Sequence, residues 1–251
     1  MLTHDQILAY ERDGFVLIEN MFNPKEVQIL MENTGSGRVQ QSKSGMKDAD
    51  GRESKLAFWT EAGDDVWGTV TRSPRVVNAA RVLLRDEVYH WHSKVMLKEP
   101  LVGGAWEWHQ DYGYWYNDGC LFPRMISCLI ALDGANKQNG CLKVLVGSHE
   151  LERVNHGSVG GQAGIDPERV RAIQARFPLK YVEAPAGSAL LFHCNLLHSS
   201  EPNLSARART SFICCYNGMS NRPYGGKGHG AVEPIRTSAE DDILRFEHAD
   251  K

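Results

Sequence analysis

Residues 88–97 read VYHWHSKVML, and from this stretch onward apolar and polar side chains tend to alternate with a period of two. Such alternation is typical of β-strands, whose successive side chains point to opposite faces of a sheet. Turn clusters such as Gly103-Gly104 and Asn139-Gly140 separate the segments, so an antiparallel sandwich or barrel is the expected architecture. The other predicted strands are residues 125–132, 141–146, 180–183, 188–192 and 210–216.

Helix signals dominate the sequence before residue 88. Thr3 followed three residues later by Gln6 is a capping-box pattern, which predicts a helix ending near Gly14. Asn23 before Pro24 is typical of an N-cap and a first helical position. Further helices are expected over residues 73–84 and 166–177, and a strand over residues 15–18.

Between these elements, residues 35–54 are rich in Gly, Ser, Lys and Asp, which predicts a long surface loop and a candidate lid over a ligand. We find no internal repeat and no linker composition. We therefore expect residues 1–251 to form one domain, with a mostly helical layer in residues 1–87 and a β core in residues 88–220.

Composition excludes several classes of protein. The chain has 251 residues, 42% of them hydrophobic and 24% charged, which suits one sizeable core. A net charge of −3 provides no basic field for nucleic acid or anionic membranes, and no apolar run approaches the roughly 20 residues of a membrane span. The N-terminus lacks the pattern of a secretory signal, so the cytoplasm is the expected location. Six cysteines without a Cys-x-x-Cys pair are expected to be buried free thiols.

The stretch WEWHQDY at residues 106–112 carries the first chemical signal. In an extended segment His109 and Asp111 point to the same face and can reach one metal ion together. A third ligand is available from His198, after the predicted strand 188–192, while His193 is interpreted as a hydrogen-bonded core residue. Two imidazoles and one carboxylate are typical of non-haem Fe(II) oxygenases, although His-x-Asp alone also fits ordinary hydrogen-bonded polar residues.

The segment after His198 adds a longer pattern. His198, Ser200, Asn203 and Arg209 have the spacing found in the phytanoyl-CoA dioxygenase family of Fe(II)- and 2-oxoglutarate-dependent oxygenases, which this chain resembles over nearly its whole length. The resemblance implies a mainly β fold with flanking α-helices, the double-stranded β-helix (a cupin-like jelly roll). It also implies that His109, Asp111 and His198 bind Fe(II), with 2-oxoglutarate and O₂ as co-substrates.

Co-substrate residues follow from the same resemblance. The guanidinium of Arg209 is suited to grip the distal carboxylate of 2-oxoglutarate, with the Ser200 hydroxyl as a second donor. Ser54-Lys55-Leu56 resembles the family segment that supplies a lysine to the co-substrate. The alternatives are a solvated strand arginine for Arg209 and a solvated surface lysine for Lys55.

Residues 108–125 also resemble the matching segment of ectoine hydroxylases, which implies that Trp115 lines the substrate site. We assign Tyr112, Tyr114 and Arg124 to the substrate as well, with ordinary core packing as the alternative for the aromatic rings. In the strand at residues 91–96, ectoine hydroxylases carry Gln, Arg and Asn at alternate positions. Here those positions hold His92, Lys94 and Met96, which indicates a different substrate. We place His92 and Lys94 beside the co-substrate, and Lys94 also suits an anionic group of the substrate.

The predicted activity is hydroxylation of a C–H bond of a small polar metabolite, with release of succinate and CO₂. The same cofactor chemistry on a phosphonate, lipid or acyl-CoA remains an alternative, as does desaturation or cyclisation. Two further alternatives are a non-catalytic jelly-roll binding protein and a zinc hydrolase built on the same three ligands. The expected partner is a small molecule, with no nucleic acid and no membrane.

Overall fold

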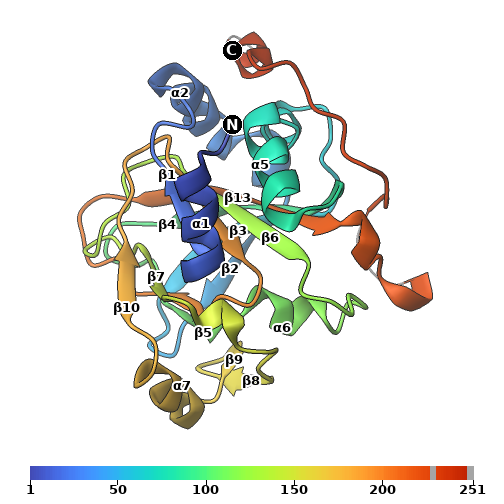
Figure 1. Ribbon diagram of the computed structural model, residues 1–251. Coiled ribbons are helices and arrows are strands. Elements are labelled where there is room, and N and C mark those ends of the chain that lie inside the picture. Colours follow the sequence, from blue (N-terminus) through green and yellow to red (C-terminus); the bar gives the residue numbers. More distant parts are fainter. Residues whose placement is uncertain (227–229, 248–251) are drawn as a thin grey trace.

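Two β-sheets face each other across the interior of the computed structural model, which describes residues 1–226 and 230–247 (Figure 1). The larger sheet is antiparallel throughout and contains most of the predicted strands. Its order is β1 (Phe15–Ile18), β11 (Ala189–His193), β6 (Met125–Ala131), β13 (Arg209–Gly218), β4 (Val88–Lys98), β3 (Glu53–Trp59) and β2 (Lys43–Lys47).

A smaller sheet lies opposite and contributes the other wall of the interior. In its pairing of β12 (His198–Ser200) with β5 (Trp106–His109), His198 lies directly opposite His109. Residues of β4 and β13 from the larger sheet, and of β5 and β12 from the smaller one, line one common cavity. This sandwich agrees with the predicted architecture. The strand order of the smaller sheet is β10 (Leu179–Val182), β7 (Leu142–Leu145), β12 (His198–Ser200) and β5 (Trp106–His109).

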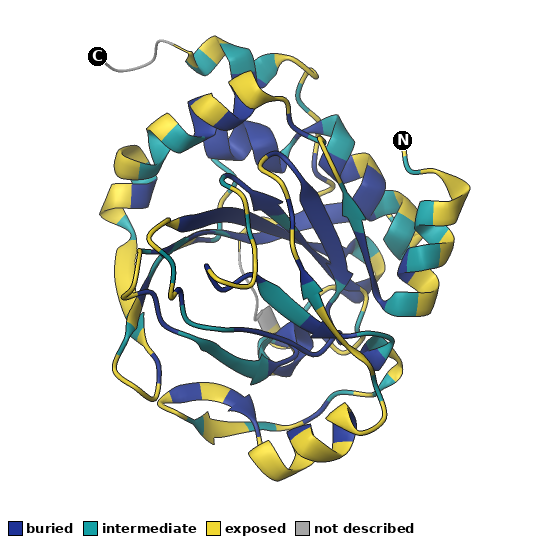
Figure 2. Ribbon diagram, turned by 90° about the vertical axis from the view of Figure 1, so that its left-hand side faces the viewer, coloured by how far each residue is buried: buried dark blue, intermediate teal, exposed yellow. Residues whose placement is uncertain are grey.

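Helices cover the outer face of the larger sheet (Figures 1 and 2). Successive side chains of β13 point to opposite faces of the sheet, which explains why the helices and the cavity lie on different sides of it. Phe212 and Cys214 pack with the helices, while Ile213 between them lines the cavity. Thr3 and Asn23 form the predicted capping boxes. These helices are α1 (His4–Asp13), α2 (Pro24–Glu32), α4 (Val66–Thr71) and α5 (Pro74–Leu84).

The prediction of a long loop over residues 35–54 was wrong. This segment contains α3 (Gly37–Gln41) and β2, and it reaches the start of β3 at Glu53. Four of the five residues of β2 are exposed, so the strand has no apolar face that a periodicity argument detects. Its backbone is ordered by antiparallel pairing with β3.

Smaller elements cover the end of the sandwich that is lowermost in Figure 1. The hairpin of β8 (His156–Val159) and β9 (Gln162–Ile165) packs beside β5, and α7 (Pro167–Gln174) follows it. Figure 2 shows that much of this end is exposed to solvent. The remaining helices are α6 (Asp111–Trp115) and the 3₁₀ turns η1 (Asn33–Gly35), η2 (Ser148–Glu150), η3 (Met219–Asn221), η4 (Tyr224–Gly226) and η5 (Asp242–Phe246).

Two predictions from composition can be compared with the structure. All six cysteines are buried and free, as expected from their spacing. None of the helices in the described part of the chain has the length and apolar content that crossing a bilayer requires.

Candidate active site

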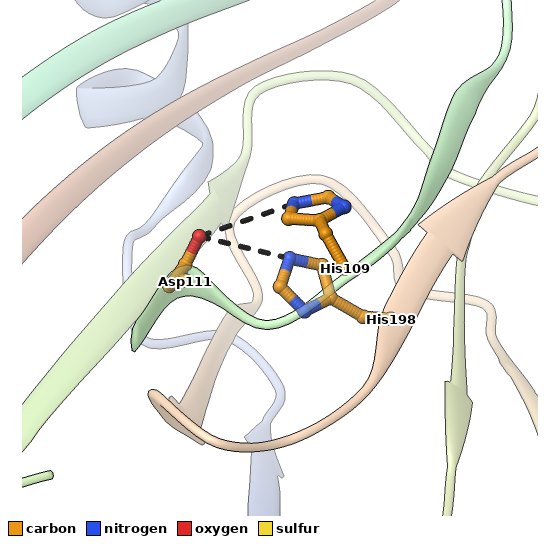
Figure 3. A group of neighbouring side chains, drawn as sticks. All are labelled: His109, Asp111 and His198. Atoms are coloured by element: carbon orange, nitrogen blue, oxygen red, sulfur yellow. Dashed lines mark ion pairs between the residues drawn. The ribbon is translucent and has the colours of Figure 1, made fainter. Parts of the chain in front are cut away.

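Three buried side chains converge from three different elements (Figure 3). His109 ends β5, Asp111 begins α6, and His198 begins β12. Asp111 Oδ1 lies 4.0 Å from His109 Nε2 and 3.9 Å from His198 Nε2, and the three ligand atoms all lie within 4.8 Å of one another. Two imidazole nitrogens and one carboxylate oxygen at these separations can bind a single metal ion.

The imidazole rings are oriented by backbone carbonyls. His109 Nδ1 lies 2.6 Å from the carbonyl oxygen of Glu107, and His198 Nδ1 lies 2.9 Å from that of Leu196. Because a carbonyl only accepts hydrogen bonds, Nδ1 carries the proton in each ring, and Nε2 presents its lone pair to the metal position.

Burial also sets the protonation states. It lowers the pKa of both His109 and His198 below the ordinary value for histidine, although Asp111 acts in the opposite direction. For Asp111 burial alone would raise the pKa, but His198, Lys94 and His109 outweigh it and hold the value at about 2. Neutral imidazoles and an ionised carboxylate are the forms that bind a metal at neutral pH, so the donor set fits Fe(II).

A cationic subsite lies in the same cavity. Arg209, at the start of β13, is 5% exposed and donates from Nη1 to the Gly140 carbonyl, while its Nε has no hydrogen-bond partner within the described chain. Burial lowers the pKa of Arg209 to about 10, so it stays cationic at neutral pH. A buried guanidinium with a free donor fits a bound carboxylate such as that of 2-oxoglutarate.

Lys98 is a residue that the sequence reasoning missed. It is fully buried, and its Nζ donates to Ser200 Oγ at 2.8 Å and to the Glu201 carbonyl at 2.5 Å. Burial, and then the charge of Arg209, lower its pKa to about 6. Lys98 lies two residues beyond Met96 on β4, so the alternation that singled out His92, Lys94 and Met96 contained the signal.

The cavity around these groups has a volume of about 440 Å³. The sequence prediction placed twelve residues at the site, and nine of them line this cavity. They are His92, Lys94, His109, Asp111, Tyr114, Trp115, His198, Ser200 and Arg209.

The structure places the other three elsewhere. Tyr112 lies on α6 and is buried, and its hydroxyl donates to the Cys120 carbonyl at 3.1 Å. Lys55 Nζ pairs with Glu99 at 2.5 Å, and neither residue lines the cavity. Arg124 is exposed and donates to Ser220 Oγ at 2.8 Å. None of these three residues lines the cavity.

Two lining residues had no recognisable sequence signal. Met46 lies on β2, which was predicted as a loop, and Gln162 begins β9. The Gln162 side chain donates to the carbonyls of Lys47 and Ala105 and accepts from the Glu107 amide. These bonds fix the hairpin of β8 and β9 against β2 and β5, at one side of the cavity.

Two imidazoles and one carboxylate around an open cavity, with a buried arginine nearby, define the class of Fe(II)- and 2-oxoglutarate-dependent oxygenases. The chain belongs to the phytanoyl-CoA dioxygenase (PhyH) family, because the family profile matches residues 10–211. The protein is therefore an enzyme that uses Fe(II), 2-oxoglutarate and O₂, as the sequence predicted.

Individual proteins similar to this chain are consistent with its membership of this family. Ectoine dioxygenase from Bordetella bronchiseptica is 29% identical over 236 residues, which cover 88% of this chain and 77% of that protein. L-proline trans-4-hydroxylase from Streptomyces griseoviridis is 28% identical over 236 residues, covering 87% and 88% of the two chains. EctD from S. alaskensis, solved with 2-oxoglutarate and 5-hydroxyectoine, is 26% identical with a TM-score of 0.80, covering 94% of this chain and 87% of that one. The jelly-roll fold class is confirmed.

Proposed function

We propose that this enzyme hydroxylates a C–H bond of a small polar metabolite and releases succinate and CO₂. The observation that carries the proposal is that the three ligand side chains and Arg209 open into one cavity. In this proposal His109, Asp111 and His198 bind Fe(II), which supplies the activation of O₂ at the expense of 2-oxoglutarate. Arg209 and the Ser200 hydroxyl bind the distal carboxylate of 2-oxoglutarate and so orient it toward the metal position.

The walls of the cavity favour a small substrate with an anionic group. Trp115 and Tyr114 contribute aromatic surface, and Lys94 contributes a half-buried ammonium group that has no ion pair within the described chain. A carboxylate or phosphonate beside Lys94 compensates this charge. The volume of about 440 Å³ lies in the ordinary range for small ligands and must also hold 2-oxoglutarate, which disfavours a whole acyl-CoA. The small molecules named in the two relatives, ectoine and L-proline, support the same size class.

Succinate formation tests this proposal. Enzyme loaded anaerobically with Fe(II) and 2-oxoglutarate is exposed to air with separate pools of amino acids and other zwitterions, phosphonates, and acyl-CoAs. We expect the zwitterion pool to stimulate succinate formation, and mass spectrometry to find a product heavier by one oxygen atom. Stimulation by acyl-CoAs alone would overturn the substrate class. Iron and 2-oxoglutarate binding without stimulation by any pool would show that none of the tested compounds is the prime substrate.

Trp115 provides the matching variant once a stimulating compound is known. The residue is 3% exposed, and its ring packs edge-on to His92, with ring centroids 5.6 Å apart. We expect Trp115→Ala to raise the KM for the prime substrate roughly tenfold, while the KM for 2-oxoglutarate stays unchanged. Trp115→Phe keeps an aromatic wall and serves as the control. An unchanged substrate KM in Trp115→Ala would assign the ring to core packing instead.

A further inference from the structure

Ser127 contacts the proposed iron site without lining the cavity. It lies in the middle of β6, is fully buried, and its Oγ donates to Asp111 Oδ2 at 2.6 Å. This bond joins the first residue of α6 to the central part of the larger sheet, across 16 residues of sequence. A hydrogen bond this short between a hydroxyl and a carboxylate is a strong, charge-assisted one.

The two oxygens of Asp111 therefore have different surroundings. Oδ1 lies almost equally far from the two imidazoles, at 4.0 Å from His109 Nε2 and 3.9 Å from His198 Nε2. Oδ2 is occupied by the hydroxyl of Ser127. A carboxylate left free to rotate can bind a metal through both oxygens and then take two coordination positions instead of one.

We propose that Ser127 is a positioning residue that holds Asp111 as a one-oxygen ligand of the iron. Because Oδ2 stays bound to Ser127, only Oδ1 is presented to the metal, and the positions that 2-oxoglutarate and O₂ require remain open. The inference rests on the proposed assignment of His109, Asp111 and His198 as iron ligands, and it is independent of the prime substrate.

The neighbouring strand β13 supports the donation of this hydrogen bond by Ser127 to Asp111. Cys215 lies opposite Ser127 in the pairing of β13 with β6, and its Sγ is 3.4 Å from Ser127 Oγ. An ionised carboxylate has no proton to donate, so the single proton of Ser127 goes to Asp111. The thiol then donates to Ser127 Oγ, and the three groups form a chain that points from Cys215 to Asp111.

Anaerobic binding measurements with Ser127→Ala test the proposal. We expect the Kd for Fe(II), measured by competition with a colorimetric chelator, to rise roughly tenfold or more, because Asp111 loses the hydrogen bond that orients it before the metal binds. We also expect a higher concentration of 2-oxoglutarate to be needed to develop the visible charge-transfer band of the Fe(II) complex. Ser127→Thr keeps the hydroxyl and should restore most of both affinities.

Two controls separate the possible failures. Ser211 lies on the adjacent strand β13 and is also buried. Its hydroxyl has no hydrogen-bond partner within the described residues, and the residue does not line the cavity, so Ser211→Ala is a matched control. It should leave both affinities unchanged. His198→Ala should abolish iron binding, and if it does not, the proposed ligand set is wrong. Parental affinities in Ser127→Ala, with loss of iron in His198→Ala, would overturn only the role of Ser127.

Discussion

Arg209 and Arg207 lie two residues apart, yet their surroundings differ completely. Arg209 begins β13, lines the cavity and is 5% exposed, whereas Arg207 precedes the strand and is exposed to solvent. A buried guanidinium keeps its charge but loses water, so its attraction for a carboxylate is stronger than at the surface. The position of each arginine therefore decides whether it can bind the co-substrate.

We predict that Arg209→Ala weakens the use of 2-oxoglutarate much more than it weakens iron binding. Removing one partner of a buried charge pair costs about 2 kcal/mol or more, so the KM for 2-oxoglutarate should rise roughly thirtyfold. Succinate formation at increasing 2-oxoglutarate concentrations measures the effect. Arg207→Ala is the matched control and should behave like the parent. An equal loss in both variants would remove Arg209 from the co-substrate subsite.

The larger sheet packs against helices on one face and lines the cavity with the other. The layer that includes α2 and α5 packs against Val95, Phe212 and Cys214, while Lys94 and Ile213 on the same strands face the cavity. α2 is linked to α5 by the ion pair of Glu26 with Arg75 at 2.5 Å. Changes in the helical layer should therefore alter stability without changing the site directly.

The N-cap of α2 tests this separation. Asn23 Oδ1 accepts from the amides of Lys25 and Glu26 at 3.0 and 3.1 Å. We expect Asn23→Ala to lower the free energy of unfolding by about 1 kcal/mol, because two helical amides lose their partner. The melting temperature should fall by roughly 2–4 °C, while the KM for 2-oxoglutarate stays at the parental value. Asn23→Ser retains a capping oxygen and should recover most of the loss; a changed KM would mean that the helical layer and the site are coupled.

Three histidines that are partly or fully buried make the stability of the protein depend on pH. Burial is the main cause that lowers the pKa of His90, His156 and His193 to about 4. Below a pH of about 6.5 the unfolded chain binds protons that the folded protein does not yet bind. The contribution of these residues to stability is therefore complete above that pH and is lost progressively as the pH falls toward 4.

His90 offers a clean test, since it is 8% exposed and does not line the cavity. Lowering the pH from 7 to 5 should cost the parent about 2 kcal/mol through this residue alone. In His90→Gln the fall in unfolding free energy over that range should be smaller by about this amount. Urea denaturation of the metal-free protein at both pH values measures the difference. Equal pH dependence in both proteins would show that the pKa of His90 is the same in the folded and unfolded states.

Local sequence patterns determined many of the helices and strands of this protein. The capping residues Thr3 and Asn23 and the two-residue alternation of β4 and β13 act over a few neighbouring positions, so the sequence alone predicts the elements that contain them. The spacing from His198 to Arg209 likewise identified the family. By contrast, β2 has almost no buried side chain, and its order depends on pairing with β3.

Tertiary structure alone decided which side chains meet. Lys98 bonds to Ser200 across 102 residues, and Ser127 bonds to Asp111 from a strand to a helix in another part of the fold. Lys55, in a segment that resembles a co-substrate site, instead pairs with Glu99. Such contacts depend on strand register and on the packing of one sheet over the other. Strand register and sheet packing are set by the sum of many interactions between distant residues, so a short stretch of sequence does not predict them.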